Sequence, residues 1–313
     1  MFANAPEKNM RIVRALLASG WLLLIASLFW DPITPELTRP DNIASPFRLS
    51  GKSVEVQGHI LSEQAYAMGN RFFWTMLIPL LPIFLLVFGH EAWRRICPLS
   101  FISQLPRYLN WQRKKPVLVR RTGQVERQLK LVSREGWISR NVQYVQFSLL
   151  FLALSSRLLF LNSDRTALAL FFIGIIIAAL TVGYLWGGKT WCGFVCPISI
   201  VQKIYTGPGG LLESQAHLTR MPVSQSMCRT ATAKGDVSTC VGCAPNCPDV
   251  DLERSYWQGI ADPARRHVYY GFVGLIVGFY SFYYFYAGNW DYYFSGAWTH
   301  ESDQLQQVFR AGL

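Results

Sequence analysis

Five segments of the chain are mostly apolar and long enough to cross a bilayer, which takes about 20 helical residues. They cover residues 12–30, 72–89, 142–161, 167–186 and 268–287. The third carries Gln143, Gln146 and Arg157, so a helix lying on the membrane surface is the alternative for that segment. The pattern predicts an all-α protein with about five transmembrane helices. Between the first two, residues 40–63 predict a small strand or hairpin.

The polar segments between these helices alternate in charge. Residues 1–14 carry three basic and one acidic side chain, 90–141 carry twelve and three, and 188–267 carry eight and six. The other segments are balanced or acidic, with four basic and five acidic in 31–71 and one and three in 289–313. Because basic loops stay inside, we expect an inner-membrane protein with a cytoplasmic N-terminus, two long cytoplasmic loops and the C-terminus outside.

Composition agrees with a membrane protein. Of the 313 residues, 51% are hydrophobic and 16% are charged, against roughly 25% charged in soluble domains. The net charge is +11, and much of it lies in residues 94–140. We interpret this basic loop as a solvated or headgroup-facing segment, with docking of an acidic redox partner as the alternative. Nucleic-acid binding is not expected, because no known nucleic-acid-binding fold accompanies the charge.

All seven cysteines lie in, or at the edges of, the two loops assigned to the cytoplasm. Disulfides are disfavoured there, so clustered cysteines predict metal binding or redox chemistry. The spacing is C-x3-C-P at Cys192 and Cys196, then Cys228, then C-x2-C-x3-C-P at Cys240, Cys243 and Cys247. The last run reproduces most of the ferredoxin pattern C-x2-C-x2-C-x3-C-P, with Val237 at its first position. It favours a [4Fe-4S] cluster over zinc, which prefers paired C-x2-C units.

Ligands follow from the ferredoxin rule that the last cysteine of a run binds the other cluster. One cluster would then take Cys228, Cys240, Cys243 and Cys196. Cys192 and Cys247 would be left for a second cluster. We therefore expect one cluster, and a second that is short of ligands.

An internal repeat offers the second site one more thiol. Residues 93–100 (WRRICPLS) align with residues 192–199 (CGFVCPIS), so Cys97 corresponds to Cys196 and Trp93 to Cys192. Both copies follow apolar helices at the cytoplasmic side, which favours a shared site. An inert cysteine at the membrane edge is the alternative for Cys97. His90, Glu91 and His267 lie at the same edge and are candidate proton acceptors for a quinol, with ordinary polar residues of the membrane interface as the alternative.

Helices followed by C-x3-C-P units, with a ferredoxin-like run between helices, resemble the membrane-bound polyferredoxins. These include NapH, the membrane domain of NosR, and the CcoG/RdxA/FixG proteins. The resemblance covers roughly residues 72–288. It implies cytoplasmic-facing [4Fe-4S] clusters that pass electrons, often from the quinol pool, with cluster ligands at Cys192, Cys196, Cys240, Cys243 and Cys247 and less directly at Cys97 and Cys228. Trp93 and Val237 depart from the family pattern.

The expected organisation has four parts. They are an N-terminal anchor with an outer loop (1–71), helices with the basic loop (72–187), the ferredoxin-like segment (188–267), and a last helix with an outer tail (268–313). We expect an electron-transfer component of an oxidoreductase system, not a stand-alone enzyme. Its partners would be the bilayer, quinol or a ferredoxin, and another redox protein. The alternatives are a metal-reducing or regulatory factor in oxidase assembly, and a structural subunit with a vestigial site.

Overall fold

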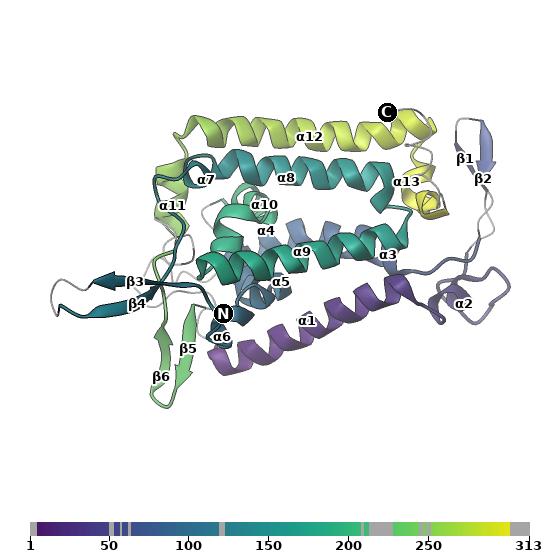
Figure 1. The fold of residues 1–313 in the computed structure, drawn as a ribbon. Coiled ribbons are helices and arrows are strands. Elements are labelled where there is room, and N and C mark those ends of the chain that lie inside the picture. Colours follow the sequence, from purple (N-terminus) through teal and green to yellow (C-terminus); the bar gives the residue numbers. More distant parts are fainter. Residues whose placement is uncertain are drawn as a thin grey trace. The chain divides into compact units, whose positions relative to one another are not determined.

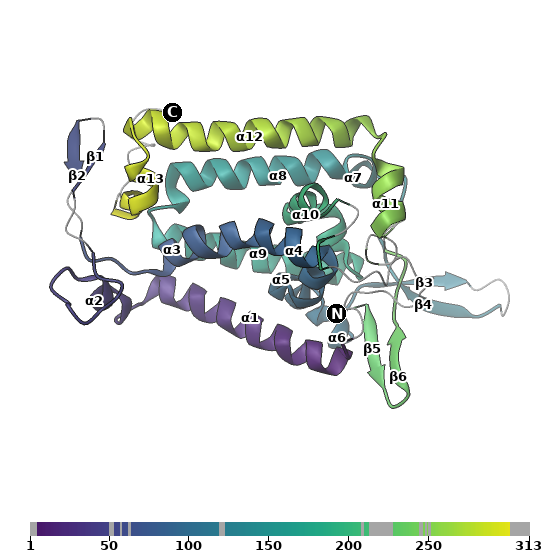
Figure 2. The same ribbon diagram turned by 180° about the vertical axis from the view of Figure 1, so that it is seen from behind.

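The computed structural model describes residues 5–49, 53–56, 58–61, 64–118, 123–207, 210–212, 228–243, 247, 249 and 252–300. This part of the chain is mostly helical, with short hairpins between the helices (Figures 1 and 2). The prediction of a largely helical protein is therefore confirmed.

Five helices of the described chain are long and apolar enough to cross a membrane. They cover Glu7–Phe29, Gly69–His90, Val142–Leu161, Arg165–Trp186 and Pro263–Tyr286. All five predicted segments are thus helical, and most of the bounds agree to within a few residues. At 1.5 Å per residue, the 22 residues of Arg165–Trp186 reach about 33 Å, close to the thickness of a bilayer core.

Short helices and strands connect the long helices along the whole chain. The first half contains α1 (Glu7–Phe29), α2 (Thr34–Thr38), β1 (Val54–Val56), β2 (His59–Leu61), α3 (Gly69–Arg71), the π-helix η1 (Phe72–Leu77), α4 (Ile78–Ile96), α5 (Pro98–Ile102), α6 (Leu105–Tyr108), β3 (Lys114–Leu118), β4 (Val125–Leu129), α7 (Trp137–Arg140) and α8 (Val142–Ser156). The second half contains the π-helix η2 (Arg157–Leu161), α9 (Arg165–Trp186), the π-helix η3 (Trp191–Val195), α10 (Ile198–Thr206), β5 (Arg229–Thr232), β6 (Gly235–Ser238), α11 (Leu252–Gly259), α12 (Pro263–Ala287), α13 (Asp291–Ser295) and the 3-10 helix η5 (Ala297–His300).

The strands form three antiparallel hairpins, β1–β2, β3–β4 and β5–β6. The first lies in the segment where the sequence predicts a hairpin. The other two were not predicted, because each contains few apolar residues and lies in a polar loop. Their registers pair Lys114 with Leu129 in β3–β4 and Arg229 with Ser238 in β5–β6.

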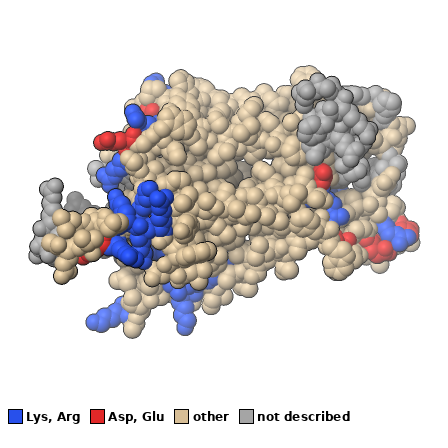
Figure 3. Space-filling model, viewed as in Figure 1, with Lys and Arg blue, Asp and Glu red and all other residues tan. Residues whose placement is uncertain are grey.

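The chain forms two compact units whose boundaries fall inside the long helices. The first unit is Met1–Trp21, Pro82–Leu150 and Gly174–Val268, and the second is Leu22–Leu81, Phe151–Ile173 and Tyr269–Leu313. Every cysteine belongs to the first unit. In Figure 3, Lys and Arg side chains gather beside the β3–β4 hairpin of the first unit, whereas the region around α2 in the second unit shows both signs of charge.

A buried ionic cluster joins three segments of the first unit. Glu7 and Arg14 of α1 form an ion pair, and both side chains are fully buried. Arg14 Nη1 donates to the carbonyl of Arg95 near the end of α4, at 3.0 Å. The backbone N–H of Glu7 donates to Asp236 Oδ2 of β6, at 2.9 Å. Because a buried charge is stable only when it is paired, this cluster fixes α1, α4 and the β5–β6 hairpin to one another.

A glycine brings α9 close to the segment that follows α5. A Cβ atom on Gly183 would lie 1.9 Å from the carbonyl oxygen of Ser103, so no larger residue fits without moving the backbone. Ser103 itself is buried. This contact places the end of α9, and the cysteines that follow it, against the segment that begins at Cys97.

The second unit buries Arg157, a charged residue inside the third predicted transmembrane segment. Its guanidinium carbon lies 4.5 Å from the ring centroid of Trp74 and 4.7 Å from that of Phe279. Arg157 Nε donates to Asn162 Oδ1 at 3.1 Å, and Asn162 Nδ2 donates to the hydroxyl of Tyr283. Two aromatic faces and one amide therefore stabilise the cation in place of water.

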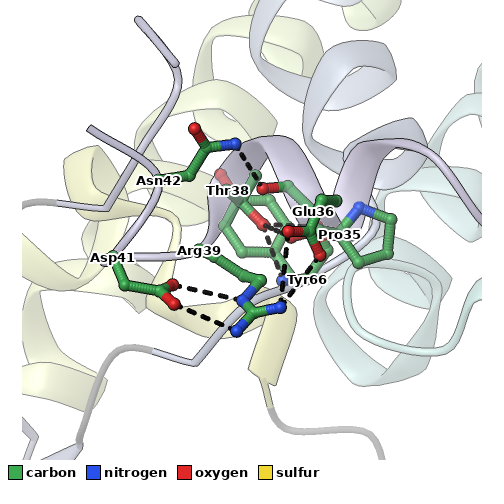
Figure 4. A network of polar contacts seen from close by, with 7 residues as sticks. All are labelled: Pro35, Glu36, Thr38, Arg39, Asp41, Asn42 and Tyr66. Atoms are coloured by element: carbon green, nitrogen blue, oxygen red, sulfur yellow. Dashed lines mark hydrogen bonds and ion pairs between the residues drawn. The ribbon is translucent and has the colours of Figure 1, made fainter. Parts of the chain in front are cut away.

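The loop around α2 is held by local polar contacts (Figure 4). Arg39 forms ion pairs with Glu36 at 3.1 Å and with Asp41 at 3.0 Å. The hydroxyl of Thr38 is buried and lies 3.0 Å from both the backbone N–H and the carbonyl of Tyr66. Because the Arg39 pairs are exposed to solvent, the buried Thr38 contacts hold the loop more firmly.

Replacing Asn162 with alanine should destabilise the second unit. Asn162→Ala removes one hydrogen bond to a buried cation and another to Tyr283, which corresponds to about 1–3 kcal/mol. We expect a lower thermal unfolding midpoint in detergent micelles. Thr181→Ala is the control, because Thr181 is exposed on α9 and bonds only its own helix. Equal midpoints for the two variants would contradict this account of Arg157.

Candidate iron–sulfur site

The two Cys-Pro units have the same local structure. Cys97 has φ −54° and ψ 116°, and Cys196 has φ −58° and ψ 119°. Each cysteine precedes a proline and a helix, α5 or α10, which follows from the fixed φ of proline at a helix start. In both units the sulfur accepts the backbone N–H groups two and three residues further on, from Leu99 and Ser100 or from Ile198 and Ser199. The sequence repeat is therefore a structural repeat.

The first group of thiols consists of Cys97, Cys192 and Cys196. They lie in one apolar cluster with Trp191. The Cys192 thiol donates to Ser100 Oγ at 3.3 Å, which ties the second repeat to the first. Burial and the neighbouring Cys192 raise the pKa of Cys97 to about 12. The same two causes, together with Cys97, raise the pKa of Cys196.

The second group consists of Cys228, Cys240 and Cys243, at the base of the β5–β6 hairpin. Cys228 precedes β5 and is buried, and its carbonyl accepts the backbone N–H of Thr239 at 3.0 Å. Cys240 is exposed, and Cys243 is partly buried. Burial, together with the charges of Cys228 and Cys240, raises the pKa of Cys243 to about 11. The hairpin therefore brings a distant cysteine, Cys228, to the C-x2-C turn.

Cys247 interacts electrostatically with Cys243 of the second group and with Arg94, which itself interacts with the first group. Burial raises its pKa above the usual range, Asp249 and Cys243 raise it further, and Arg94 lowers it. Arg94 in turn interacts with Cys192 of the first group. Several residues around Cys247, including 244–246 and 248, lie outside the described part of the chain.

The side chain of Cys243 packs against the backbone of a glycine turn that follows α9. Gly188 has φ +58°, and a Cβ atom added to it would lie 2.8 Å from Cys243 Cβ and 3.1 Å from Cys243 Sγ. The backbone N–H of Lys189 donates to the Cys243 sulfur. Backbone N–H groups that point at cysteine sulfurs are a means of stabilising thiolate ligands. The end of α9 thus contributes to the second group as well as to the first.

Three buried charges lie among these thiols. Arg94 Nη1 is 2.7 Å from Asp249 Oδ1, and Lys189 Nζ is 3.3 Å from Asp249 Oδ2. Burial raises the pKa of Asp249, but the two cations outweigh it and hold that pKa well below its usual value. Burial likewise lowers the pKa of Lys189, but the charges of Asp249 and Cys228 outweigh it and keep that pKa above its usual value.

Sequence reasoning missed this triad of Arg94, Lys189 and Asp249. A signal was available, since Arg94 and Lys189 each lie three residues before a cysteine of a repeat, Cys97 and Cys192. The spacing gave no indication of Asp249 as their partner, because Asp249 is 155 residues from Arg94 in the sequence.

The proposed proton acceptors are separated from one another. His90 is buried, and it lies close enough to Asp249 to lower the pKa of that carboxyl, which places it beside the triad. His267 instead lies 3.1 Å from the hydroxyl of Tyr144 in an exposed contact. The side chain of Glu91 lies outside the described part of the structure. Among the acceptors whose side chains the structure describes, His90 is thus the one linked to Asp249.

The chemistry of the site is decided by comparison with known families. Residues 167–212, which include α9, Cys192, Cys196 and α10, match the model of a 4Fe-4S binding domain. The chain carries a 4Fe-4S domain. Neither curated proteins nor solved structures give a match. In the described residues no three His, Cys, Asp or Glu side chains converge as they would on a single metal ion. Two groups of thiols, with the Gly188 turn against Cys243, suit the iron–sulfur domain.

Replacing Gly188 with alanine should remove bound iron. The positive φ costs about 1–2 kcal/mol in any L-residue, and the added Cβ atom would displace Cys243. We expect a clear loss of iron and acid-labile sulfide per chain after anaerobic purification of Gly188→Ala.

Gly193→Ala is the matched control for this measurement. Gly193 lies between Cys192 and Cys196, and a Cβ atom there meets nothing within 4 Å. Its iron content should equal that of the wild type. Full iron in both variants would mean that the Gly188 turn does not position a cluster ligand.

Proposed function

We propose that this chain is a membrane-bound iron–sulfur protein that relays single electrons between the quinol pool, or a ferredoxin, and another redox protein. The observation that carries the proposal is the gathering of Cys97, Cys192 and Cys196 around a 4Fe-4S domain that begins in an apolar helix of membrane-spanning length. The cluster supplies one-electron chemistry, and the protein supplies its placement. The resemblance to membrane-bound polyferredoxins supports the same function.

We propose two cluster sites with a revised set of ligands. Cys196 has Cys192 and Cys97 as its electrostatic neighbours, which favours a site of these three completed by Cys247. Cys247 is followed by a proline, and the ferredoxin rule assigns such a cysteine to the other cluster. Cys228, Cys240 and Cys243 then form the second site, with three thiolates. This pairing moves Cys196 out of the group that the spacing alone suggested.

His90 supports quinol as a donor. Oxidation of one quinol releases two electrons and two protons, and a cluster accepts one electron at a time. A proton acceptor is therefore needed beside the site. His90 is buried, close enough to influence Asp249, and at the end of the apolar stretch Gly69–His90.

The exposed Cys240 supports a protein as the acceptor. A cluster edge open to solvent can approach a redox partner closely, whereas a fully buried one cannot. Cys240 is the exposed member of its group, and the β5–β6 hairpin beside it is exposed along most of its length.

Removing single cysteines should separate the two sites. Cys97→Ala should lose the iron of the first site and keep that of the second, and Cys243→Ala should do the reverse. The measurements are iron, sulfide and the EPR spectrum of dithionite-reduced protein purified without oxygen.

Val237→Ala is the control for the cysteine variants. Val237 is exposed and occupies the position where a ferredoxin run has its first cysteine. It should retain the wild-type spectrum. Zinc in place of iron, or full iron in both cysteine variants, would refute the proposed sites.

The orientation proposed from charge places the cysteine loops in the cytoplasm and the C-terminus outside. A membrane-impermeant maleimide should then label His300→Cys in intact spheroplasts. Gln124→Cys, in the basic loop, should be labelled only after permeabilisation. Labelling of His300→Cys only after permeabilisation would contradict this topology.

A further inference from the structure

Arg94, Lys189 and Asp249 form a buried group with a net positive charge. Their side chains are 5%, 3% and 2% exposed, and both cations share the one carboxylate. Arg94 Nε also donates to Gln202 Oε1 at 3.1 Å, which holds the guanidinium without adding charge. Two cations and one anion give these three side chains a net charge of +1.

A net buried charge is costly unless an opposite charge lies close to it. Among the ion pairs of the described residues, Asp249 is the carboxylate that Arg94 and Lys189 contact. Lys189 Nζ makes no hydrogen bond within this part of the chain, although its side chain is nearly inaccessible to water. An ammonium group held in this way is stabilised further by any additional negative charge nearby.

The cysteines of both groups supply that charge when they bind a cluster as thiolates. Arg94 interacts with Cys192 and Cys247, and Lys189 interacts with Cys228 and Cys192. The backbone of Lys189 also contacts Cys243, through its N–H group and the Gly188 turn. The triad therefore faces ligands assigned to each of the two sites.

We propose that the Arg94–Asp249–Lys189 triad sets the reduction potentials of the clusters by holding a fixed charge of +1 beside their thiolate ligands. Adding one electron to a cluster adds one negative charge and breaks no bond, so a nearby cation stabilises the reduced form. Asp249 fixes the positions of the two cations and limits their combined charge. The inference rests on the cluster sites assigned under the proposed function.

Each substitution changes the charge of the triad by a known amount, so the direction of the expected change in midpoint potential is known for each variant. Lys189→Met brings the triad to zero and should lower the midpoint potential, as should Arg94→Gln. Asp249→Asn brings it to +2 and should raise the potential. The double variant Lys189→Met with Asp249→Asn returns to +1 and should move back toward the wild type. The readout is an EPR-monitored redox titration of the purified full-length protein.

Lys114→Met is the control, because Lys114 is exposed on the β3–β4 hairpin. Its potential should equal that of the wild type. Iron and sulfide analysis of every variant separates the two proposals, since a wild-type protein without iron refutes the cluster sites themselves. Wild-type clusters with potentials that do not follow the sign of the charge overturn the inference about the triad.

The inference about the triad can still be tested if some variants lose their iron. If Lys189→Met and Arg94→Gln bind no cluster, the potential of Asp249→Asn must lie above that of the wild type. If all three lose iron, while Lys189→Arg and Asp249→Glu do so as well, the triad builds the site and does not tune it. That result would also overturn the inference.

Discussion

The first unit depends on one buried carboxylate. Asp249 joins Arg94, near the end of α4, to Lys189, just after α9, and so connects segments that are far apart in the sequence. Removing one partner of a buried pair leaves a charge without compensation and strongly destabilises the fold. The three segments must therefore stay close enough to keep the contact. Each of the three side chains has a cysteine two or three residues away in the sequence, namely Cys97, Cys192 and Cys247. Their relative positions therefore depend on the same interaction.

The Cys-Pro unit occurs twice with the same local structure, and the cysteines of both copies lie in one apolar cluster. A proline that starts a helix fixes the backbone before it, and the first turn directs N–H groups at the preceding sulfur. The two copies differ where the first has Trp93 and the second Cys192. Trp93 packs edge-on against Phe84, with ring centroids 6.1 Å apart. The first copy thus contributes one cysteine and an aromatic contact, and the second contributes two cysteines.

The two units bury positive charge in different ways. Arg157 lies between two aromatic rings and pairs with an amide, so its charge is spread over polarisable groups. Arg94 and Lys189 share a carboxylate and face thiols instead. Under the proposal for the triad, Arg94 and Lys189 lie where their charge can act on the cysteine ligands. Arg157 has partners that replace the water lost on burial.

Local chemistry made much of this protein predictable from the sequence. Apolar runs of about 20 residues predicted the five long helices, because runs of that length and composition are typical of membrane-spanning helices. The cysteine spacing predicted an iron–sulfur cofactor, because short turns bring thiols to one side, and the match to a 4Fe-4S domain agrees with it. The grouping of Cys196 with Cys97, the approach of Gly188 to Cys243 and the place of Asp249 were decided by tertiary structure. Each of these depends on which distant segments pack together, and neither helix propensity nor spacing encodes that choice.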